Sequence, residues 1–274
     1  MAAAAAMNIT EPAMCGIGGD MFCLYYNAKT KKTHALNGSG RSPAGNTLEQ
    51  IRKDIGAKDG EDAKIPFTGV QSVSVPGAAA GLVDTVEKFG SGKLSLEQVF
   101  APAIELGEDG YPVSELVAGL WQRSETLIRN ASPNFAEMLK KDTKAKDGCR
   151  APRAGEIFKN PTLANTLRLM AKHGKKGFYE GEVAEQIVKV VQDLGGHMTL
   201  DDLKHHADTG SEEVDPVSMK IEGLGLKEPV ELWEHPPNGQ GLVALIAFGI
   251  LQQLEKAGKI KAFTRDDHNT VESV

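Results

Sequence analysis

Arg41 is the side chain in this sequence best suited to binding a small anionic ligand. It lies in the segment Asn-Gly-Ser-Gly-Arg-Ser-Pro at residues 37–43, directly after a predicted β-hairpin. A guanidinium can hold a carboxylate through two parallel hydrogen bonds, which makes Arg41 a candidate substrate ligand. A single arginine in a loop is more often solvated or in a surface ion pair. A role for Arg41 without a ligand therefore stays open.

Two other loops offer backbone N–H groups to a ligand. Residues 16–20, Gly-Ile-Gly-Gly-Asp, could cradle a phosphate, but a dinucleotide site needs a strand before the glycines and a helix after them. Here a helix that ends before Pro12 precedes them and a strand follows, so we predict a tight turn. Residues 236–241, Pro-Pro-Asn-Gly-Gln-Gly, lead into a predicted helix whose first N–H groups could hold an oxyanion; a simple connection is the favoured alternative.

Histidines, cysteines and acidic pairs predict neither a metal site nor a reactive thiol. His205 and His206 are adjacent, so on a helix they would point in different directions, and no second ligand pair follows them four residues later. Cys15, Cys23 and Cys149 form no C-x-x-C pair, which argues against a disulfide framework and favours a reducing, cytoplasmic compartment. Cys15, the best thiol candidate, is predicted to be a small core residue. Neighbouring carboxylates such as Asp201 and Asp202 are interpreted as solvated surface.

Composition excludes several classes of protein. The chain has 274 residues and a formal net charge of −6, which argues against nucleic acid as its main partner. Its hydrophobic content of 41% is enough for a sizeable core, and no stretch reaches the ~18 apolar residues of a membrane span.

Hydrophobic periodicity predicts helices and strands that alternate without a strict βαβ order, hence an α+β class. A β-hairpin is predicted over 21–37, and residues 140–153 are predicted to be a surface loop between helices. Further strands are predicted at 217–221 and 230–235, and helices at 78 onward, 96–107, 161–171, 183–191, 199–203 (one capped turn) and 241–254. A last helix is expected to start near His268.

A series of short motifs runs through the chain in a fixed order. They are residues 8–12 (Asn-Ile-Thr-Glu-Pro) with 16–20, 38–43, 75–81 (Val-Pro-Gly-Ala-Ala-Ala-Gly), 101–106 with 110–114, 160–164 (Asn-Pro-Thr-Leu-Ala), 178–181 (Phe-Tyr-Glu-Gly), 195–203 and 236–241. The series resembles the large-subunit region of the γ-glutamyltranspeptidase, or glutathione hydrolase, family. The Gly-Ser-Gly-Arg-Ser-Pro form resembles a transpeptidase-like branch that is related also to the cephalosporin acylases.

The resemblance implies an enzyme with the four-layer αββα fold of the N-terminal-nucleophile hydrolases. Such a precursor cleaves itself into two subunits, and the new N-terminal threonine of the small subunit takes a γ-glutamyl group from glutathione and passes it to water or an amino acid. The implied partners are a γ-glutamyl substrate and the small subunit of the same precursor, and no cofactor is implied. Residues 1–274 are then expected to be a single domain, a fragment of the large subunit that is incomplete at both ends.

The sequence differs from the family pattern at two places. The nucleophilic threonine is expected beyond Val274, so the fragment alone is expected to be inactive; Thr264 and Thr270 lack the expected setting. Many members of the family have an Arg-Glu pair whose arginine binds the α-carboxylate of the γ-glutamyl group. In this sequence Ser39 occupies the position of that arginine. Arg41, two residues later, is therefore carried over as a possible substrate ligand.

Two alternatives to a γ-glutamyl enzyme remain open from the sequence. The chain could be a non-catalytic, partner-binding remnant of the same fold, whose exposed sheet face must find a partner or aggregate. It could instead belong to an amidase or acylase that acts on other acyl groups, such as β-lactam side chains.

Overall fold

The computed structural model describes residues 1–58 and 60–263, which contain both helices and small antiparallel sheets. The chain divides into two compact units, and each is described by itself. Unit 1 contains residues 1–21 and 38–211, and unit 2 contains residues 22–37 and 212–274. The expectation of a single domain over 1–274 stays a prediction.

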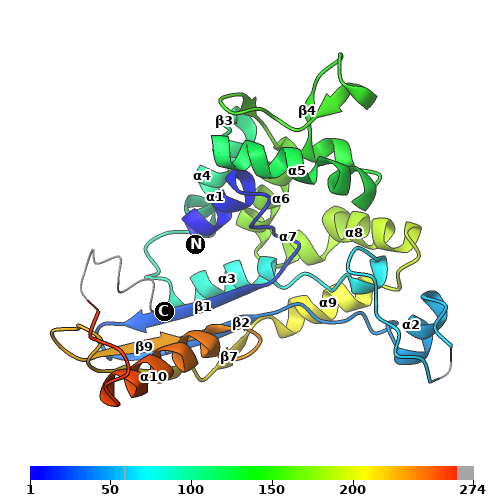
Figure 1. Ribbon diagram of the computed structural model, residues 1–274. Coiled ribbons are helices and arrows are strands. Elements are labelled where there is room, and N and C mark those ends of the chain that lie inside the picture. Colours follow the sequence, from blue (N-terminus) through cyan, green and yellow to red (C-terminus); the bar gives the residue numbers. More distant parts are fainter. Residues whose placement is uncertain (59, 264–274) are drawn as a thin grey trace. The chain divides into compact units, whose positions relative to one another are not determined.

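Unit 1 is mainly helical and contains the large hydrophobic core (Figure 1). The core is built from small and branched apolar side chains of the helices together with the aromatic rings of Phe100, Tyr111, Trp121, Phe158 and Tyr179. The helices are α1 (Ala2–Thr10), α2 (Leu48–Asp54), α3 (Ala78–Phe89), α4 (Leu96–Asp109), α5 (Glu115–Ala131), α6 (Pro161–His173), α7 (Lys176–Tyr179), α8 (Gly181–Asp193) and α9 (Leu200–Thr209).

Local sequence signals set the ends of several helices in unit 1. Ser95 forms a capping box with Gln98 at the start of α4, and Gly110, at φ 90°, ends that helix. The Asn160 side chain accepts a hydrogen bond from the Leu163 N–H and so caps α6, with Pro161 at its first position. These boundaries confirm the helices predicted near 96–107 and 161–171.

Helices α1 and α6 both pack against α4 (Figure 1). A Cβ atom at Gly107 would lie 2.8 Å from the Ala164 Cβ, so only glycine allows α4 and α6 to approach this closely. The contact explains why a glycine occurs within an otherwise strong helical pattern.

Several segments of unit 1 differ from the sequence-based expectation. The 17-residue helix α5 was not predicted, and α9 runs for ten residues rather than one turn. Residues 140–153 are not purely a loop, because β4 (Lys140–Lys141) pairs with β5 (Cys149–Arg150). Another short ribbon pairs β3 (Tyr111–Pro112) with β6 (Ile157–Phe158).

In its described residues, unit 2 contains the longer strands and one helix. β1 (Met21–Asn27) and β2 (Lys32–Gly38) form the predicted hairpin, and β2 also pairs with β7 (Glu212–Val214). The Asn27 side chain accepts hydrogen bonds from the N–H groups of Lys29 and Thr30, which explains the turn between β1 and β2. The second ribbon joins β8 (Val217–Ile221) to β9 (Val230–Glu234), and α10 (Gly241–Lys256) packs on both of its strands.

Two further expectations concern a membrane span and the end of the chain. Over the described residues, no helix combines the length and apolar character needed to cross a membrane. The helix expected near His268 lies outside the described residues. Thr264 and Thr270 lie outside them too.

Candidate functional site

The backbone of the Arg41 loop is held in unit 1 by a close backbone contact with residues 75–77. Arg41 and Val75 exchange hydrogen bonds of 3.3 and 2.8 Å as an isolated β-bridge. A Cβ atom at Gly40 would lie 2.3 Å from the Val75 oxygen, and one at Gly77 would lie 2.3 Å from the Gly38 oxygen. Both glycines are required by space, so the loop has little room to move at these points.

The glycine cluster at 16–20 supports the same junction. The Gly19 carbonyl accepts hydrogen bonds from the N–H groups of Gly77 (3.0 Å) and Ala78 (2.8 Å), where α3 begins. The Asp20 carboxylate accepts one from the Gly40 N–H at 2.7 Å. The predicted tight turn is confirmed, since Gly19 N–H also bonds back to the Gly16 carbonyl. The Gly19 carbonyl therefore pairs two of the N–H groups at the start of α3.

The Arg41 side chain extends to the last turn of α9. Its Nη1 lies 2.6 Å from Nδ1 of His206 and 3.4 Å from the Gly210 carbonyl oxygen, and Nη2 lies 3.5 Å from the same oxygen. A cation at this end of a helix is stabilised by the unpaired carbonyls and the helix dipole. The structure thus gives Arg41 ordered protein contacts, and its role as a substrate ligand stays a prediction.

His206 is completely buried and is held on its other side by aromatic contact. Its ring lies 5.3 Å from the ring of Tyr179, whose hydroxyl donates to the Pro76 carbonyl (2.7 Å) and accepts from the Ala80 N–H (3.0 Å). Burial, and then the positive charge of Arg41, lower the pKa of His206 to about 4. The imidazole is therefore neutral at pH 7, so Nδ1 can accept from Arg41 while Nε2 carries the proton.

The buried carboxylate of Asp84 fixes the residues that follow α9. Asp84 pairs with Lys175 at 2.9 Å, and its second oxygen accepts a hydrogen bond from the Ser211 N–H at 2.7 Å. A Cβ atom at Gly210, whose φ is 62°, would lie 2.8 Å from that same Asp84 oxygen. The position of the Gly210 carbonyl, which Arg41 contacts, is thereby set by α3 and Lys175.

The other residues singled out from the sequence lie apart from this cluster. His205 is exposed, as expected for the neighbour of a buried histidine on a helix, and Cys15 is half-buried, so its predicted core position is wrong. Among the described residues, no group of three His, Cys, Asp or Glu side chains could hold a metal ion.

The loop at 236–241 lies in unit 2. The His235 ring nitrogens lie 2.8 Å from the Pro236 carbonyl and 3.2 Å from the Leu36 carbonyl, and its ring packs at 5.0 Å on Phe22. These contacts fix the entry to α10, whose first residue is Gly241. An oxyanion role for this loop stays a prediction.

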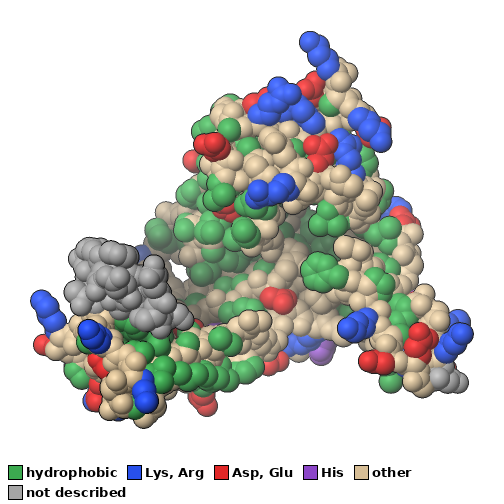
Figure 2. Space-filling view, viewed as in Figure 1, with side chains coloured by type: hydrophobic (Ala, Val, Ile, Leu, Met, Phe, Trp, Pro, Cys, Tyr) green, Lys and Arg blue, Asp and Glu red, His purple; other side chains and the backbone are tan. Residues whose placement is uncertain are grey.

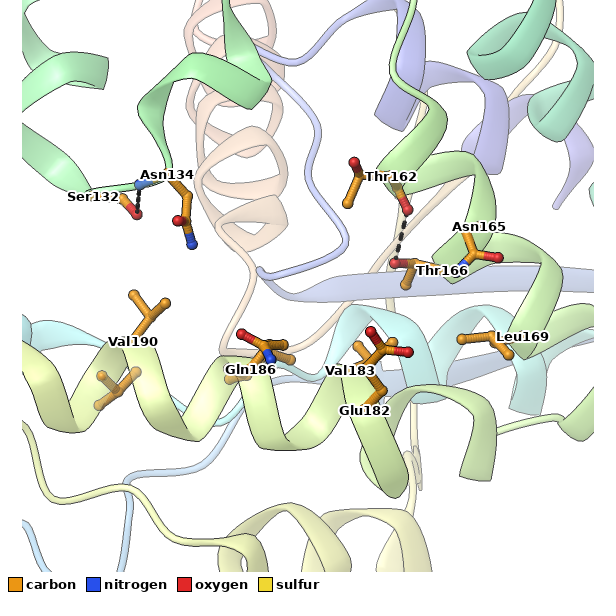
Figure 3. A pocket seen from close by; sticks show the side chains of 12 residues that line it. Ser132, Asn134, Thr162, Asn165, Thr166, Leu169, Glu182, Val183, Gln186 and Val190 are labelled. Carbon is orange, nitrogen blue, oxygen red and sulfur yellow. Dashed lines mark hydrogen bonds between the residues drawn. The ribbon is translucent and has the colours of Figure 1, made fainter.

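A cavity of about 430 Å³ in unit 1 contains none of the candidate residues (Figure 3). Its wall is formed by apolar side chains of α8 such as Val183 and Val190, and by polar side chains such as Asn134 and Asn165. Glu182 is the charged residue that lines it.

Sequence reasoning missed the three side chains that support Arg41, namely His206, Tyr179 and Asp84. One signal was available for His206, because Leu203, His206, Ala207 and Gly210 follow the spacing of one helical face. That spacing predicts a longer helix with a buried histidine. No local pattern links residue 41 to residue 206.

Comparison with known proteins identifies the family. A family model described as gamma-glutamyltranspeptidase matches residues 1–274. The glutathione hydrolase-like YwrD proenzyme of Bacillus subtilis is 32% identical over 273 residues, which cover 99% of this chain and 46% of the relative. The chain thus spans about half the length of that relative.

Solved structures show the same relationship. Cephalosporin acylase from Bacillus halodurans is 35% identical with a TM-score of 0.77, over 98% of this chain and 46% of that chain. Helicobacter pylori gamma-glutamyltranspeptidase is 25% identical with a TM-score of 0.75, over 92% of this chain and 66% of that chain. The α+β architecture is therefore part of the N-terminal-nucleophile hydrolase fold, and this chain belongs to the γ-glutamyltranspeptidase family.

Proposed function

We propose that this chain forms the large-subunit part of an enzyme that cleaves γ-glutamyl amides such as glutathione. The observation that carries the proposal is the family match over residues 1–274, together with 32% identity to a glutathione hydrolase-like proenzyme. The nucleophile is an N-terminal threonine on a small subunit cut from the same precursor. The large-subunit chain by itself is then inactive.

The proposed chemistry divides the work between the two subunits. The free α-amine of the small subunit's threonine takes the proton of its own hydroxyl, which attacks the γ-carbonyl, and N–H donors stabilise the oxyanion. Arg41 binds the carboxylate at the far end of the acyl group. Its support is the rigid loop at 38–43 and the fixed contacts of its guanidinium with His206 and Gly210.

An apolar face of α10 supports the proposed small-subunit partner. Val243, Ile246 and Ile250 follow the spacing of one helical face and are 63%, 54% and 55% exposed. Figure 2 shows hydrophobic side chains gathered over α10, at the lower left. A contiguous apolar surface of this kind is typical of a protein interface, and we propose that the small subunit covers it.

The test compares the full-length precursor with residues 1–274 alone, each assayed with a γ-glutamyl anilide. We expect the precursor to cleave itself and release the aniline, and the chain alone to be inactive. Turnover by the chain alone at a rate abolished by Arg41→Ala would overturn the placement of the nucleophile. A precursor whose second subunit does not begin with threonine would overturn the proposal that this protein is an enzyme. It would favour a non-catalytic, partner-binding remnant of the fold.

The second candidate function is an acylase that acts on other acyl groups, favoured by the likeness to cephalosporin acylase. A glutaryl group differs from a γ-glutamyl group only by lacking the α-amino group, and both end in a carboxylate. Comparing kcat/KM for the two anilides on the full-length precursor therefore isolates recognition of the amino group. Preference for γ-glutamyl supports the leading proposal, and preference for glutaryl supports the acylase.

A further inference from the structure

We propose that His206 is a positioning residue, which holds the Arg41 guanidinium in the orientation that binds the substrate's carboxylate. The inference rests on the proposed function, because it takes Arg41 as the carboxylate ligand. Nothing in the sequence pattern assigned a role to His206, which lies 165 positions from Arg41.

Helix α9 contacts the Arg41 loop through one stripe of its surface. Asp202, His206 and Gly210 are spaced four residues apart and so lie on the same face of the helix. Asp202 accepts a hydrogen bond from the Ala44 N–H at 2.8 Å, while His206 and the Gly210 carbonyl contact the guanidinium. The loop is thus held by α9 at two points, one on its backbone and one on the Arg41 side chain.

The guanidinium lies closer to His206 than to the Gly210 carbonyl. The distance from Nη1 to Nδ1 is 2.6 Å, whereas the two distances to the Gly210 oxygen are 3.4 and 3.5 Å. A flexible arginine side chain loses rotamer freedom when it is ordered, so an acceptor that orders it beforehand lowers the cost of binding a ligand. His206 can perform this task because it is itself unable to turn.

The surroundings of His206 fix its ring. It is fully buried, its ring packs on Tyr179, and the Tyr179 hydroxyl bonds to both Pro76 and Ala80. The first turn of α9 is fixed as well, by a capping box between Thr199 and Asp202. The Arg41 loop, α3 and α9 therefore form one connected support.

The charge state of His206 suits an acceptor. The charged and titratable groups that act on it are Arg41, Asp84, His205 and Lys175, and burial is the largest influence. Together they lower its pKa to about 4, so the ring stays neutral and does not repel the guanidinium. Its Nε2 is buried and has no hydrogen-bond partner among the described residues, so its hydrogen-bonding function rests on Nδ1.

The experiment measures KM and kcat with a γ-glutamyl anilide for the full-length precursor and three variants. His206→Leu removes the acceptor but stays apolar, and His206→Asn keeps an acceptor oxygen on the carbon that carries Nδ1. The matched control is His205→Leu, the exposed neighbour on the same helix. We expect KM to rise about tenfold in His206→Leu with kcat within about threefold, and to be largely restored in His206→Asn. The control should behave as the wild type.

Two results would overturn the inference. An unchanged KM in His206→Leu means that His206 does not position Arg41. Equal loss in the Leu and Asn variants, with kcat falling and KM constant, means that the histidine only supports folding. Melting curves identify unfolded variants, and if His206→Leu does not fold, His206→Phe replaces it, since it keeps a ring without the acceptor.

Failure of the proposed function is visible in the wild type, before any variant is compared. If the wild-type precursor uses the glutaryl anilide instead, the same KM comparison on that substrate decides the inference, because the carboxylate is retained. If it uses neither substrate, both the proposed function and the role of His206 are wrong.

Discussion

At the scale of the residue, the neutral state of His206 makes stability depend on pH. Its pKa is about 4 in the folded chain and 6.5 in an unfolded one. Between these values the unfolded state binds a proton that the folded state does not, so the free energy of unfolding falls as the pH is lowered from 6.5 to 4. Above pH 6.5 this effect is absent, because the ring is neutral in both states.

We predict that His206→Asn removes this part of the pH dependence. The wild-type precursor should lose roughly 2–3 kcal/mol more than the variant between pH 7 and pH 4. Urea unfolding at several pH values measures the difference, and carboxylates that titrate in the same range cancel in the comparison. Parallel pH profiles for the two proteins would contradict the prediction.

Gly77 offers a second prediction at this scale, based on space rather than charge. A Cβ atom there would lie 2.3 Å from the Gly38 oxygen and 2.7 Å from the Gly40 nitrogen, and both are backbone atoms that have little freedom to move. We expect Gly77→Ala to destabilise the precursor by about 2–3 kcal/mol. Gly18→Ala is the matched control, because nothing lies within 4 Å of its Cβ position, and it should change stability by less than about 0.5 kcal/mol. Similar melting temperatures for the two variants would show that the junction can relax.

At the scale of the element, α9 combines a strong start signal with a role in holding the Arg41 loop. Thr199 and Asp202 form its capping box, and Asp202 also accepts the Ala44 N–H. Burial raises the pKa of Asp202, but the hydrogen bonds from Ala44 and Thr199 outweigh burial and lower it. The cap and the loop contact therefore share one carboxylate.

We predict that Thr199→Ala destabilises the precursor by about 1 kcal/mol through loss of the cap. Its control is Thr166→Ala inside α6, where the hydroxyl donates to the Thr162 carbonyl at 3.2 Å and alanine is the better helix former. Thermal melting measures both variants. A loss in Thr166→Ala as large as that in Thr199→Ala would mean that the cap contributes nothing specific.

At the scale of the whole molecule, α10 presents an apolar face to solvent. Replacing Ile246, at 54% exposure, with glutamate places a charge where we propose that the small subunit packs. We expect Ile246→Glu to weaken the two-subunit assembly by about 2 kcal/mol or more. Leu48→Glu is the control, because Leu48 lies on α2 and is 77% exposed.

Gel filtration of the self-cleaved protein measures whether the two subunits elute as one complex. Ile246→Glu should release free subunits at concentrations where the Leu48→Glu protein elutes as one complex. Co-elution of both variants would show that the small subunit does not cover this face. Sedimentation of residues 1–274 alone as a stable, soluble monomer would count against an interface there too.

Predictions from sequence were accurate where a local signal decides the structure. The Asn160 cap, the Ser95 capping box and Gly110 mark helix ends by hydrogen bonds within a few residues, and these helices occur as predicted. Helix α5 was missed although its sequence carries local signals, because Ser114 caps it and Val117, Ala118 and Trp121 are spaced on one helical face. The expectation for 199–203 was too short because it used the cap and left out the buried stripe beyond it.

The sequence by itself determined the α+β class, the ends of several helices and, through the ordered motifs, the family. Each of these depends on residues that are near one another in the chain or on a series that keeps its order. Only the tertiary structure decided that Arg41 contacts His206 and Gly210, and that Asp84, Lys175 and Tyr179 support that contact. The physical reason is that burial and hydrogen bonding act between side chains that are distant in sequence, and folding alone brings them together.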